Sequence, residues 1–367
     1  MKLFPISAPS ITQKEVDYVT DAVRSGWVSS AGPYIEQFEK KYAEFIGVKH
    51  AISTSNGTTA LHLSLLSYGI GKGDEVIVPD FSFIATANAV TYTGAVPVMV
   101  DVDPKTWNIN PANIEKAISE RTKAIIPVHI YGLPADMNSI LDIAAKYNLL
   151  VIEDAAEAHG AQIGDRKVGG IGSCGVFSFY GNKIITTGEG GMITTNDDHI
   201  NTRARYLRDH AMSKERRYWH PEVGYNYRMT NMQAALGLAQ LERANEIIVK
   251  KQQIFSWYKS ALNNVKGVTL NPEIEGVKNV YWMVCVLFDP SLHIDIDEFI
   301  VLLKNKGVDS RPFFYPMSSM PMYSSAGHDS PIANYLHANG INLPSGADLT
   351  EEDVFSIADT IKNLLSA

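Results

Sequence analysis

The sequence predicts an α/β protein whose first part forms a large, mainly parallel sheet and whose last part forms a smaller α+β domain. In the first part, short apolar segments alternate with helical patterns, which is typical of βαβ units with helices on both faces of a sheet. The chain of 367 residues, 45% hydrophobic and 20% charged, is long enough for two globular domains. The alternation ends in a long helical pattern, and we place the domains at residues 1–245 and 246–367.

Two helices are expected before the first strand. Thr12 and Glu15 form a capping-box pattern at the start of the first helix, which ends at Gly26. Its apolar stripe consists of Val16, Val19 and Val23. The second helix begins at Pro33, a favourable first helical residue, and ends at Gly47.

The alternating part of the chain contains five expected strands and three expected helices. The strands are residues 50–53, 75–78, 96–100, 124–128 and 149–152, and the helices are residues 59–68, 84–92 and 137–147. A single long helix is expected over residues 230–262. In the smaller domain we expect a strand at 281–287, a helix at 296–306 and a last helix capped by Thr350.

Composition and charge argue against several classes of protein. A net charge of −8 argues against a nucleic-acid partner, because proteins that bind nucleic acids usually carry a basic face. The two cysteines, Cys174 and Cys285, lie in apolar segments, so we expect a reduced compartment. The start of the chain contains no apolar run long enough for a signal peptide or a membrane span. We therefore expect a cytoplasmic enzyme that has no membrane partner.

Metal and dinucleotide sites are not expected. The histidines and cysteines do not have the spacing of metal ligands. Residues 170–175 match the dinucleotide pattern G-x-G-x-x-G, but they lead into an apolar strand instead of a helix. We interpret these residues as a loop.

The most informative segment is VFSFYGNKIITTGEGG, at residues 176–191. It begins as a buried strand, turns at Gly181 and Asn182, and presents Lys183 before a glycine-rich turn. Lysine is rarely buried, and burial lowers its pKa, which gives a neutral amine able to attack carbonyls. The alternative is a surface lysine in a hairpin turn, and this segment alone leaves both interpretations open.

Two other segments carry groups that suit a phosphorylated cofactor. Residues 55–59, SNGTT, join a strand to a helix whose N-terminus offers free N–H groups to a phosphate, although an ordinary helix cap is the alternative. Asp154 closes another strand, at the edge where open α/β sheets bind ligands, although it could instead cap the following turn. Together with a buried lysine, these groups are what a pyridoxal 5′-phosphate site needs, because a carboxylate keeps the ring nitrogen protonated.

Taken together, the motifs resemble those of the DegT/DnrJ/EryC1/StrS family of sugar aminotransferases over essentially the whole chain. The matching segments are SGWVSS at 25–30, SNGTTALHL at 55–63, GDEVIVP at 73–79, VHIYG at 128–132, IEDAAEAHG at 152–160, FSFYGNKIITTGEGGM at 177–192, YNYRMTN at 225–231 and GINLPS at 340–345. The resemblance implies the aspartate aminotransferase fold of type I pyridoxal phosphate enzymes and a transaminase reaction.

The resemblance also implies roles for individual residues. Lys183 would carry the cofactor covalently and move the proton, and Asp154 would bind the pyridine nitrogen. The other cofactor-binding residues would be Gly57, Thr58 and Ser178 at the phosphate, Glu157 near the ring hydroxyl and Phe83 over the ring face. Asn226 would reach the phosphate of the other subunit, so the functional unit would be a homodimer with active sites at its interface.

The implied reaction transfers an amino group from glutamate to C4 of a nucleotide-linked 4-keto-6-deoxyhexose. RYWH at 217–220, SRPFFYP at 310–316 and MPMY at 320–323 are most similar to family members that convert GDP-4-keto-6-deoxy-D-mannose to GDP-perosamine, and UDP- or dTDP-linked sugars are the alternatives. The candidate substrate-binding residues are Tyr218, His220, Arg228, Arg311 and Tyr315.

Two segments depart from the family pattern. Asp80 stands where relatives usually have a small polar residue, and Gly170 and Ser173 replace parts of a G-T-F-G-D segment. Each departure could reshape the sugar pocket or only a loop. A protein that binds the cofactor or a nucleotide sugar without turnover is the alternative from another class, and the presence of Lys183 argues against it, because such a protein needs no nucleophile.

Overall fold

The computed structural model describes residues 2–324 and 329–366. Its largest element is a seven-stranded sheet with the order β1-β9-β8-β5-β4-β2-β3. The strands are β1 (His50–Thr54), β2 (Glu75–Pro79), β3 (Val96–Val100), β4 (Thr122–Ile125), β5 (Leu150–Asp154), β8 (Cys174–Ser178) and β9 (Gly191–Thr195). β3, β2, β4, β5 and β8 pair in parallel, whereas β9 is antiparallel to β8 and to β1. The mainly parallel sheet predicted from the sequence is confirmed.

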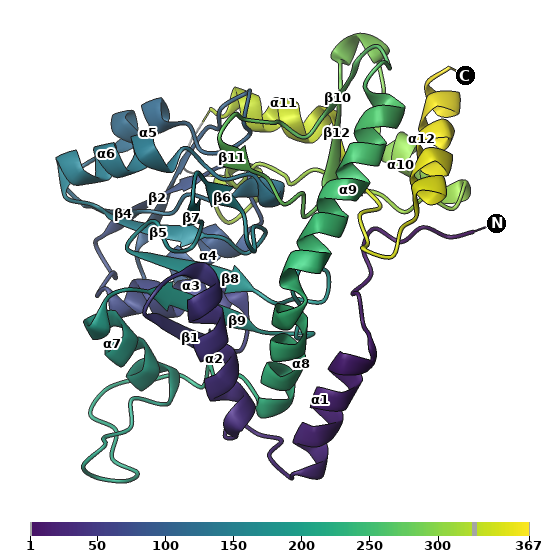
Figure 1. Ribbon diagram of the computed structural model, residues 1–367. Coiled ribbons are helices and arrows are strands. Elements are labelled where there is room, and N and C mark those ends of the chain that lie inside the picture. The colour runs from purple at the N-terminus through teal and green to yellow at the C-terminus, as the bar shows by residue number, and fades with distance from the viewer. Residues whose placement is uncertain (1, 325–328, 367) are drawn as a thin grey trace.

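Helices cover both faces of this sheet (Figure 1). Alternate residues of β2 show the two faces, because Val76 and Val78 pack in one apolar cluster and Ile77 packs in another. The first face is covered by α3 (Gly57–Ser67), α4 (Ala85–Tyr92) and α7 (Asp198–Arg208). The second face is covered by α2 (Pro33–Ile46), α5 (Pro111–Ala117), α6 (Met137–Tyr147) and α8 (Asn231–Glu242).

A second, antiparallel sheet has the order β10-β12-β14-β13. Its strands are β10 (Val268–Leu270), β12 (Val284–Phe288), β14 (Gly340–Leu343) and β13 (Arg311–Pro312). It shares an apolar cluster with α9 (Ala244–Leu262), α10 (Ile296–Asn305) and α12 (Glu351–Leu365), and α11 (Pro331–Asn339) packs against its inner strand β12. The strand expected at 281–287 is therefore β12, shifted toward the C-terminus.

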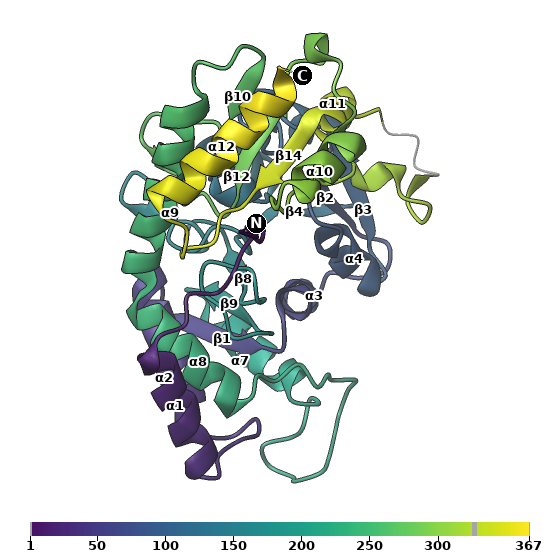
Figure 2. The ribbon, with the colours of Figure 1, turned by 90° about the vertical axis from the view of Figure 1, so that its right-hand side faces the viewer.

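Segments distant in sequence connect the two sheets. β11 (Val277–Lys278) pairs with β6 (Gln162–Ile163), which also pairs with β7 (Arg166–Lys167). Near the N-terminus, Phe4 forms a bridge with Val308, and Figure 2 shows the chain running from α1 (Gln13–Arg24) toward the second sheet. The division of the chain at residue 245 stays a prediction.

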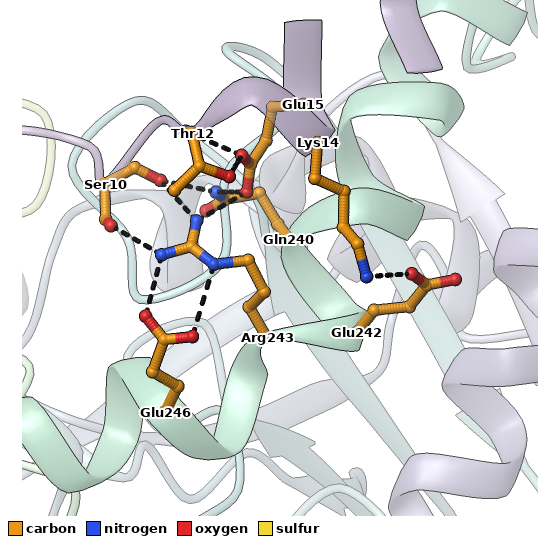
Figure 3. A network of polar contacts seen from close by, with 8 residues as sticks. All are labelled: Ser10, Thr12, Lys14, Glu15, Gln240, Glu242, Arg243 and Glu246. Carbon is orange, nitrogen blue, oxygen red and sulfur yellow. Dashed lines mark hydrogen bonds and ion pairs between the residues drawn. The ribbon is translucent and has the colours of Figure 1, made fainter. Parts of the chain in front are cut away.

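The single helix predicted over residues 230–262 is wrong, because the chain forms α8 and α9 with a break at Arg243. Arg243 has φ −109° and ψ 6°, and its guanidinium binds Glu15 at 2.7 Å, Ser10 at 3.0 Å and Glu246 at 2.9 Å (Figure 3). Glu15 is buried, so this cation satisfies a charge that α1 brings into the interior. The break thus lies at a residue whose partners Ser10 and Glu15 are more than two hundred positions away.

The capping box predicted at Thr12 and Glu15 is confirmed, but the valine stripe of α1 is not buried in the chain itself. Val16 and Val23 are 48% and 51% exposed, and the helix buries Glu15 and Ala22 instead. α1 therefore presents apolar side chains to the outside. Among the described residues, the helices are too short or too polar for one to cross a bilayer.

Candidate active site

Lys183 lies on the turn that follows β8, with its side chain mostly buried. Its backbone N–H donates to the carbonyl of Tyr180 at 2.9 Å, and its side chain is only 11% exposed. Nζ lies 3.7 Å from Glu157 Oε1 and 3.7 Å from the centre of the Trp282 ring. The alternative of a surface lysine in a hairpin turn is wrong.

Asp154 lies at the C-terminal end of β5, and its carboxylate is also buried. The Thr86 hydroxyl donates to Oδ2 at 2.8 Å, and the Ala156 N–H donates to Oδ1 at 3.2 Å. Burial raises the pKa of Asp154, while these donors and the charge of Lys183 oppose the rise. Both donors are neutral groups. A cation placed beside Asp154 would therefore interact with a charged carboxylate that is buried away from water.

Glu157, one turn beyond Asp154, completes the charged centre. The Tyr131 N–H donates to Glu157 Oε2 at 2.7 Å. Burial raises the pKa of Glu157 to about 7, and burial lowers the pKa of Lys183. Burial therefore moves both partners toward their neutral forms, and a neutral Lys183 is a nucleophile.

The N-terminus of α3 lies against the end of β8. Asn56 caps the helix by accepting from the Thr59 N–H at 2.9 Å, which leaves the N–H groups of Gly57 and Thr58, the first two of the helix, outside the cap. A Cβ on Gly57 would lie 2.9 Å from the Ser178 Cβ, so only glycine allows this approach. The site can thus offer two N–H groups, the helix dipole and a serine hydroxyl to an anion.

A buried histidine fixes the end of β8. His159 Nε2 donates to the Ser178 carbonyl at 2.8 Å, and the Tyr42 hydroxyl donates to Nδ1 at 2.7 Å. Burial lowers the pKa of His159 to about 3, so the ring is neutral and has the tautomer that these two bonds require. His159 thereby holds the strand end between Lys183 and the N-terminus of α3.

Aromatic rings form a row that begins at Lys183. Trp282 donates from Nε1 to the Asn182 carbonyl at 2.8 Å and stacks on Tyr131, with centres 6.2 Å apart and planes at 20°. Tyr131 stacks on Phe314 at 5.4 Å and 11°, and Phe314 packs against Phe83 at 6.1 Å. Phe83 is 56% exposed, so the row leads from the buried amine to the protein surface.

Several predicted site residues lie away from this centre. Arg228 pairs with Asp209 at 2.7 Å and donates to the Asn226 amide oxygen at 3.0 Å, and His220 binds the His210 carbonyl at 2.8 Å. The remaining predicted residues are exposed Tyr218, Arg311 paired with Asp309, and Tyr315 packed on His337. Within the described parts of the chain, none of these residues forms a hydrogen bond or ion pair with Lys183, Asp154 or Glu157.

Three residues of the site were not singled out from the sequence. Thr86, Tyr131 and Trp282 contact Asp154, Glu157 and Lys183, respectively. Trp282 lay within a predicted strand that gave no indication of a role, and Thr86 lay within a predicted helix. Tyr131 has φ +51°, a strained backbone that only the structure shows.

The predicted loop at residues 170–175 is confirmed for residues 170–173, whereas Cys174 and Gly175 already belong to β8. Buried Glu153 accepts from the N–H groups of Gly169 at 2.8 Å, and of Ile171 and Gly172 at 2.7 Å. His129 Nε2 also lies 3.1 Å from this carboxylate. The glycines of this loop thus surround a carboxylate of the protein itself. In the described residues no group of histidine, cysteine, aspartate and glutamate side chains could hold a metal ion.

Comparisons with known proteins agree with this geometry. The model of the DegT/DnrJ/EryC1/StrS aminotransferase family matches residues 9–362. The GDP-perosamine synthase of Caulobacter vibrioides is 49% identical over 362 residues, which cover 98% of each chain. The solved structure of Helicobacter pylori PseC, an aminotransferase involved in the biosynthesis of pseudoaminic acid, has a TM-score of 0.94 and 28% identity, with 100% of each chain covered. The PLP-form of the putative sugar aminotransferase Spr1654 from Streptococcus pneumoniae has a TM-score of 0.94 and 27% identity, with 99% of each chain covered.

Proposed function

This chain belongs to the DegT/DnrJ/EryC1/StrS aminotransferase family, and we propose that it moves an amino group from glutamate to C4 of GDP-4-keto-6-deoxy-D-mannose, with pyridoxal phosphate as its cofactor. The family, the fold and the aminotransferase activity predicted from the sequence are confirmed by the full-length relatives. The observation that carries the proposal is the mostly buried Lys183 amine beside Glu157. Lys183 follows β8, and buried Asp154 ends β5, the strand that pairs with β8.

The residues present fit pyridoxal phosphate. Its phosphate suits the first N–H groups of α3, at Gly57 and Thr58, together with the Ser178 hydroxyl. Its ring nitrogen suits Asp154, which is buried and has only neutral donors. Glu157 would lie near the ring hydroxyl, and Phe83 would cover a ring face. When bound, the cofactor supplies an aldehyde for amino-group exchange and a ring that accepts electrons from a carbon that loses its proton.

Lys183 performs the proton transfers in this proposal. Its low exposure keeps bulk water from the amine, and its lowered pKa leaves Nζ free to take a proton from one carbon and return it to another. Glu157 and the Trp282 ring hold the amine from two sides. Asp154 supplies a fixed negative charge that favours a protonated ring nitrogen. Glutamate would give the amino group in the first half of the exchange, and the keto sugar would accept it in the second.

We propose that the active unit is a homodimer. Val16, Val23 and Trp27 are exposed around α1, and Tyr180, three residues before Lys183, is also exposed. Apolar side chains exposed beside a site are typical of an interface, and two-fold dimers are the commonest oligomers. Asn226 lies on an exposed segment from which it would reach the phosphate of the other subunit.

The cytoplasm is the compartment we propose. Cys174 and Cys285 are both buried free thiols, which is typical of proteins in reducing compartments.

The test measures the exchange with purified holoenzyme. Glutamate alone should convert the absorbance of the protein-bound cofactor from its aldehyde to its amine form, and a GDP-linked 4-keto sugar should reverse the change. The kcat/KM values for GDP-, UDP- and dTDP-linked 4-keto sugars are then compared. A tenfold preference for the UDP sugar, only about 1.4 kcal/mol of transition-state binding, would contradict the assignment of GDP but not of the aminotransferase. Lys183→Ala should lose this exchange. Lys167→Ala, which changes a partly buried lysine on β7, is its control.

A further inference from the structure

We propose that Asp80 and Ser318 form a latch that holds the aromatic mouth of the active site and thereby sets the affinity for the nucleotide-linked keto sugar. The inference rests on the proposed function and adds two positioning residues to it. Asp80 directly follows β2, and Ser318 lies in a short turn after β13, so the latch connects the large sheet with the second domain.

Asp80 is fully buried, and both oxygens of its carboxylate are bound by one residue. The Ser318 N–H donates to Oδ1 at 2.7 Å, and the Ser318 hydroxyl donates to Oδ2 at 2.5 Å. The Asp80 carbonyl accepts from the Met317 N–H at 2.8 Å, and Phe81 forms an antiparallel bridge with Pro316. A buried carboxylate is costly unless hydrogen bonds satisfy it, so the position of residues 316–318 depends on Asp80.

The segment that the latch holds carries aromatic rings. Phe313 is buried, 5.8 Å from the ring of Phe81. Phe314 stacks on Tyr131 and packs against Phe83. Tyr315 is half exposed and packs on His337 with centres 3.8 Å apart. Displacement of residues 316–318 would therefore move Phe314 and Tyr315 directly.

These rings are connected to the reacting amine by direct contacts. Phe314 faces Tyr131, whose N–H binds Glu157 and whose ring stacks on Trp282, beneath Lys183. Tyr315, which directly follows Phe314, is half exposed and offers an apolar ring face and a hydroxyl. A hexose ring and a purine base both present flat or apolar faces to which such rings bind. The latch would thus act on the nucleotide-linked sugar, while glutamate, which lacks these groups, would not depend on it.

The presence of Asp80 in this chain has a physical explanation in this arrangement. A hydroxyl at position 80 would present one oxygen to the two Ser318 donors, whereas the carboxylate presents a separate charged oxygen to each. The departure from the family pattern at this position is therefore explained as part of a contact that orients the mouth, and not as a change confined to a loop.

The experiment compares Ser318→Val with Ser318→Thr, two side chains of nearly equal shape that differ in the hydroxyl. In the holoenzyme, we expect Ser318→Val to raise the KM for the GDP-linked 4-keto sugar about tenfold, as the loss of one hydrogen bond to a buried charge predicts. Ser318→Thr should stay within twofold of the parent. The rate at which glutamate alone converts the cofactor absorbance should be unchanged in both variants. Ser319→Ala, which removes a hydroxyl bound to the Pro316 carbonyl in the same turn, is the control.

Three outcomes would overturn the latch. Equal KM values for Ser318→Val and Ser318→Thr would show that the hydroxyl does not act. An equal loss of rate with glutamate and with the sugar would show a general structural role. If Ser318→Val fails to fold, Ser318→Ala replaces it, since it removes the same hydroxyl and adds no volume, and an unchanged KM there would also overturn the inference. A parent enzyme that aminates no nucleotide-linked sugar but exchanges with glutamate would instead contradict the proposed substrate.

Discussion

Lys183 and Lys251 are two buried lysines with opposite surroundings. Lys251, on α9, donates from Nζ to the carbonyls of Trp282 at 2.7 Å and Ser345 at 2.6 Å. In the described residues, Lys183 Nζ has no acceptor within hydrogen-bond distance, and its partners are a carboxylate at 3.7 Å and the ring of Trp282. Burial lowers the pKa of both amines, that of Lys251 to about 7.

The comparison shows that a lowered pKa alone does not identify a catalytic lysine. The Lys251 amine donates to two backbone carbonyls and ties α9 to the segments that precede β12 and follow β14. The Lys183 amine is positioned by Glu157 and the Trp282 ring without a hydrogen bond to an acceptor in the described residues, so it remains available to react. Because Lys251 binds the carbonyl of Trp282 and Lys183 contacts the ring, the structural lysine supports the residue that covers the reactive one.

The largest expected effect is the loss of activity in Lys183→Ala. Removal of the amine abolishes both covalent attachment and proton transfer, so kcat should fall by at least about 10³-fold. Lys251→Met should keep kcat within about tenfold and lower the thermal midpoint instead. Borohydride reduction and peptide mapping should place the cofactor on Lys183; a label on Lys251 or Lys167 would reverse the comparison.

Asp154→Asn should have the next largest effect, a loss of at least about 10²-fold in kcat, because a neutral amide cannot favour a protonated ring nitrogen. Burial raises the pKa of Asp154, so its charge costs stability at neutral pH in the cofactor-free protein. The Asn variant should therefore unfold at the same or a higher temperature. A variant that is fully active would show that Asp154 only caps the following turn.

The local parts of the fold and site could be predicted from the sequence. The apolar pattern of β2 and the apolar run that becomes β8 are formed by residues adjacent in sequence. The motifs around Asp154 and Lys183 likewise each lie within one short segment. The break at Arg243 was not predicted, and the contact of Arg243 with Glu15 joins two helices that are far apart in sequence. Trp282, just before β12, reaches Lys183 only through the packing of the second sheet against the first, and nothing near either residue in sequence indicates that contact.

A third prediction tests whether the region around Lys183 is complete in one chain. Asn226→Asp places a charge that would repel a phosphate from the partner subunit's site and should be inactive in the homodimer. Mixed with Lys183→Ala under subunit exchange, half of the dimers are hybrids, each with one site free of both changes. Activity should then return to about a quarter of the parental value, as random two-fold assembly predicts. If exchange is proven and no activity returns, Asn226 acts within its own subunit.

The smallest expected effect is a change in the pH dependence of stability in Lys251→Met. The pKa of Lys251 is lowered from 10.5 to about 7 in the folded protein, so between these values the unfolded chain binds more protons than the folded one. The unfolding free energy of the parent should therefore rise with pH relative to the variant, by about 1 kcal/mol from pH 7 to pH 8 and about 1.4 kcal/mol over the next unit. Below pH 7 both states are protonated and the difference should level off. Urea unfolding of the cofactor-free proteins at pH 6, 7, 8 and 9 measures it, with Lys250→Met, a partly exposed neighbour on α9 whose amine lies over the Trp257 ring, as the control. A difference that is constant over this range would mean that the two carbonyls and the charge of Asp348 keep Lys251 protonated in the folded protein, in contradiction to the lowered pKa.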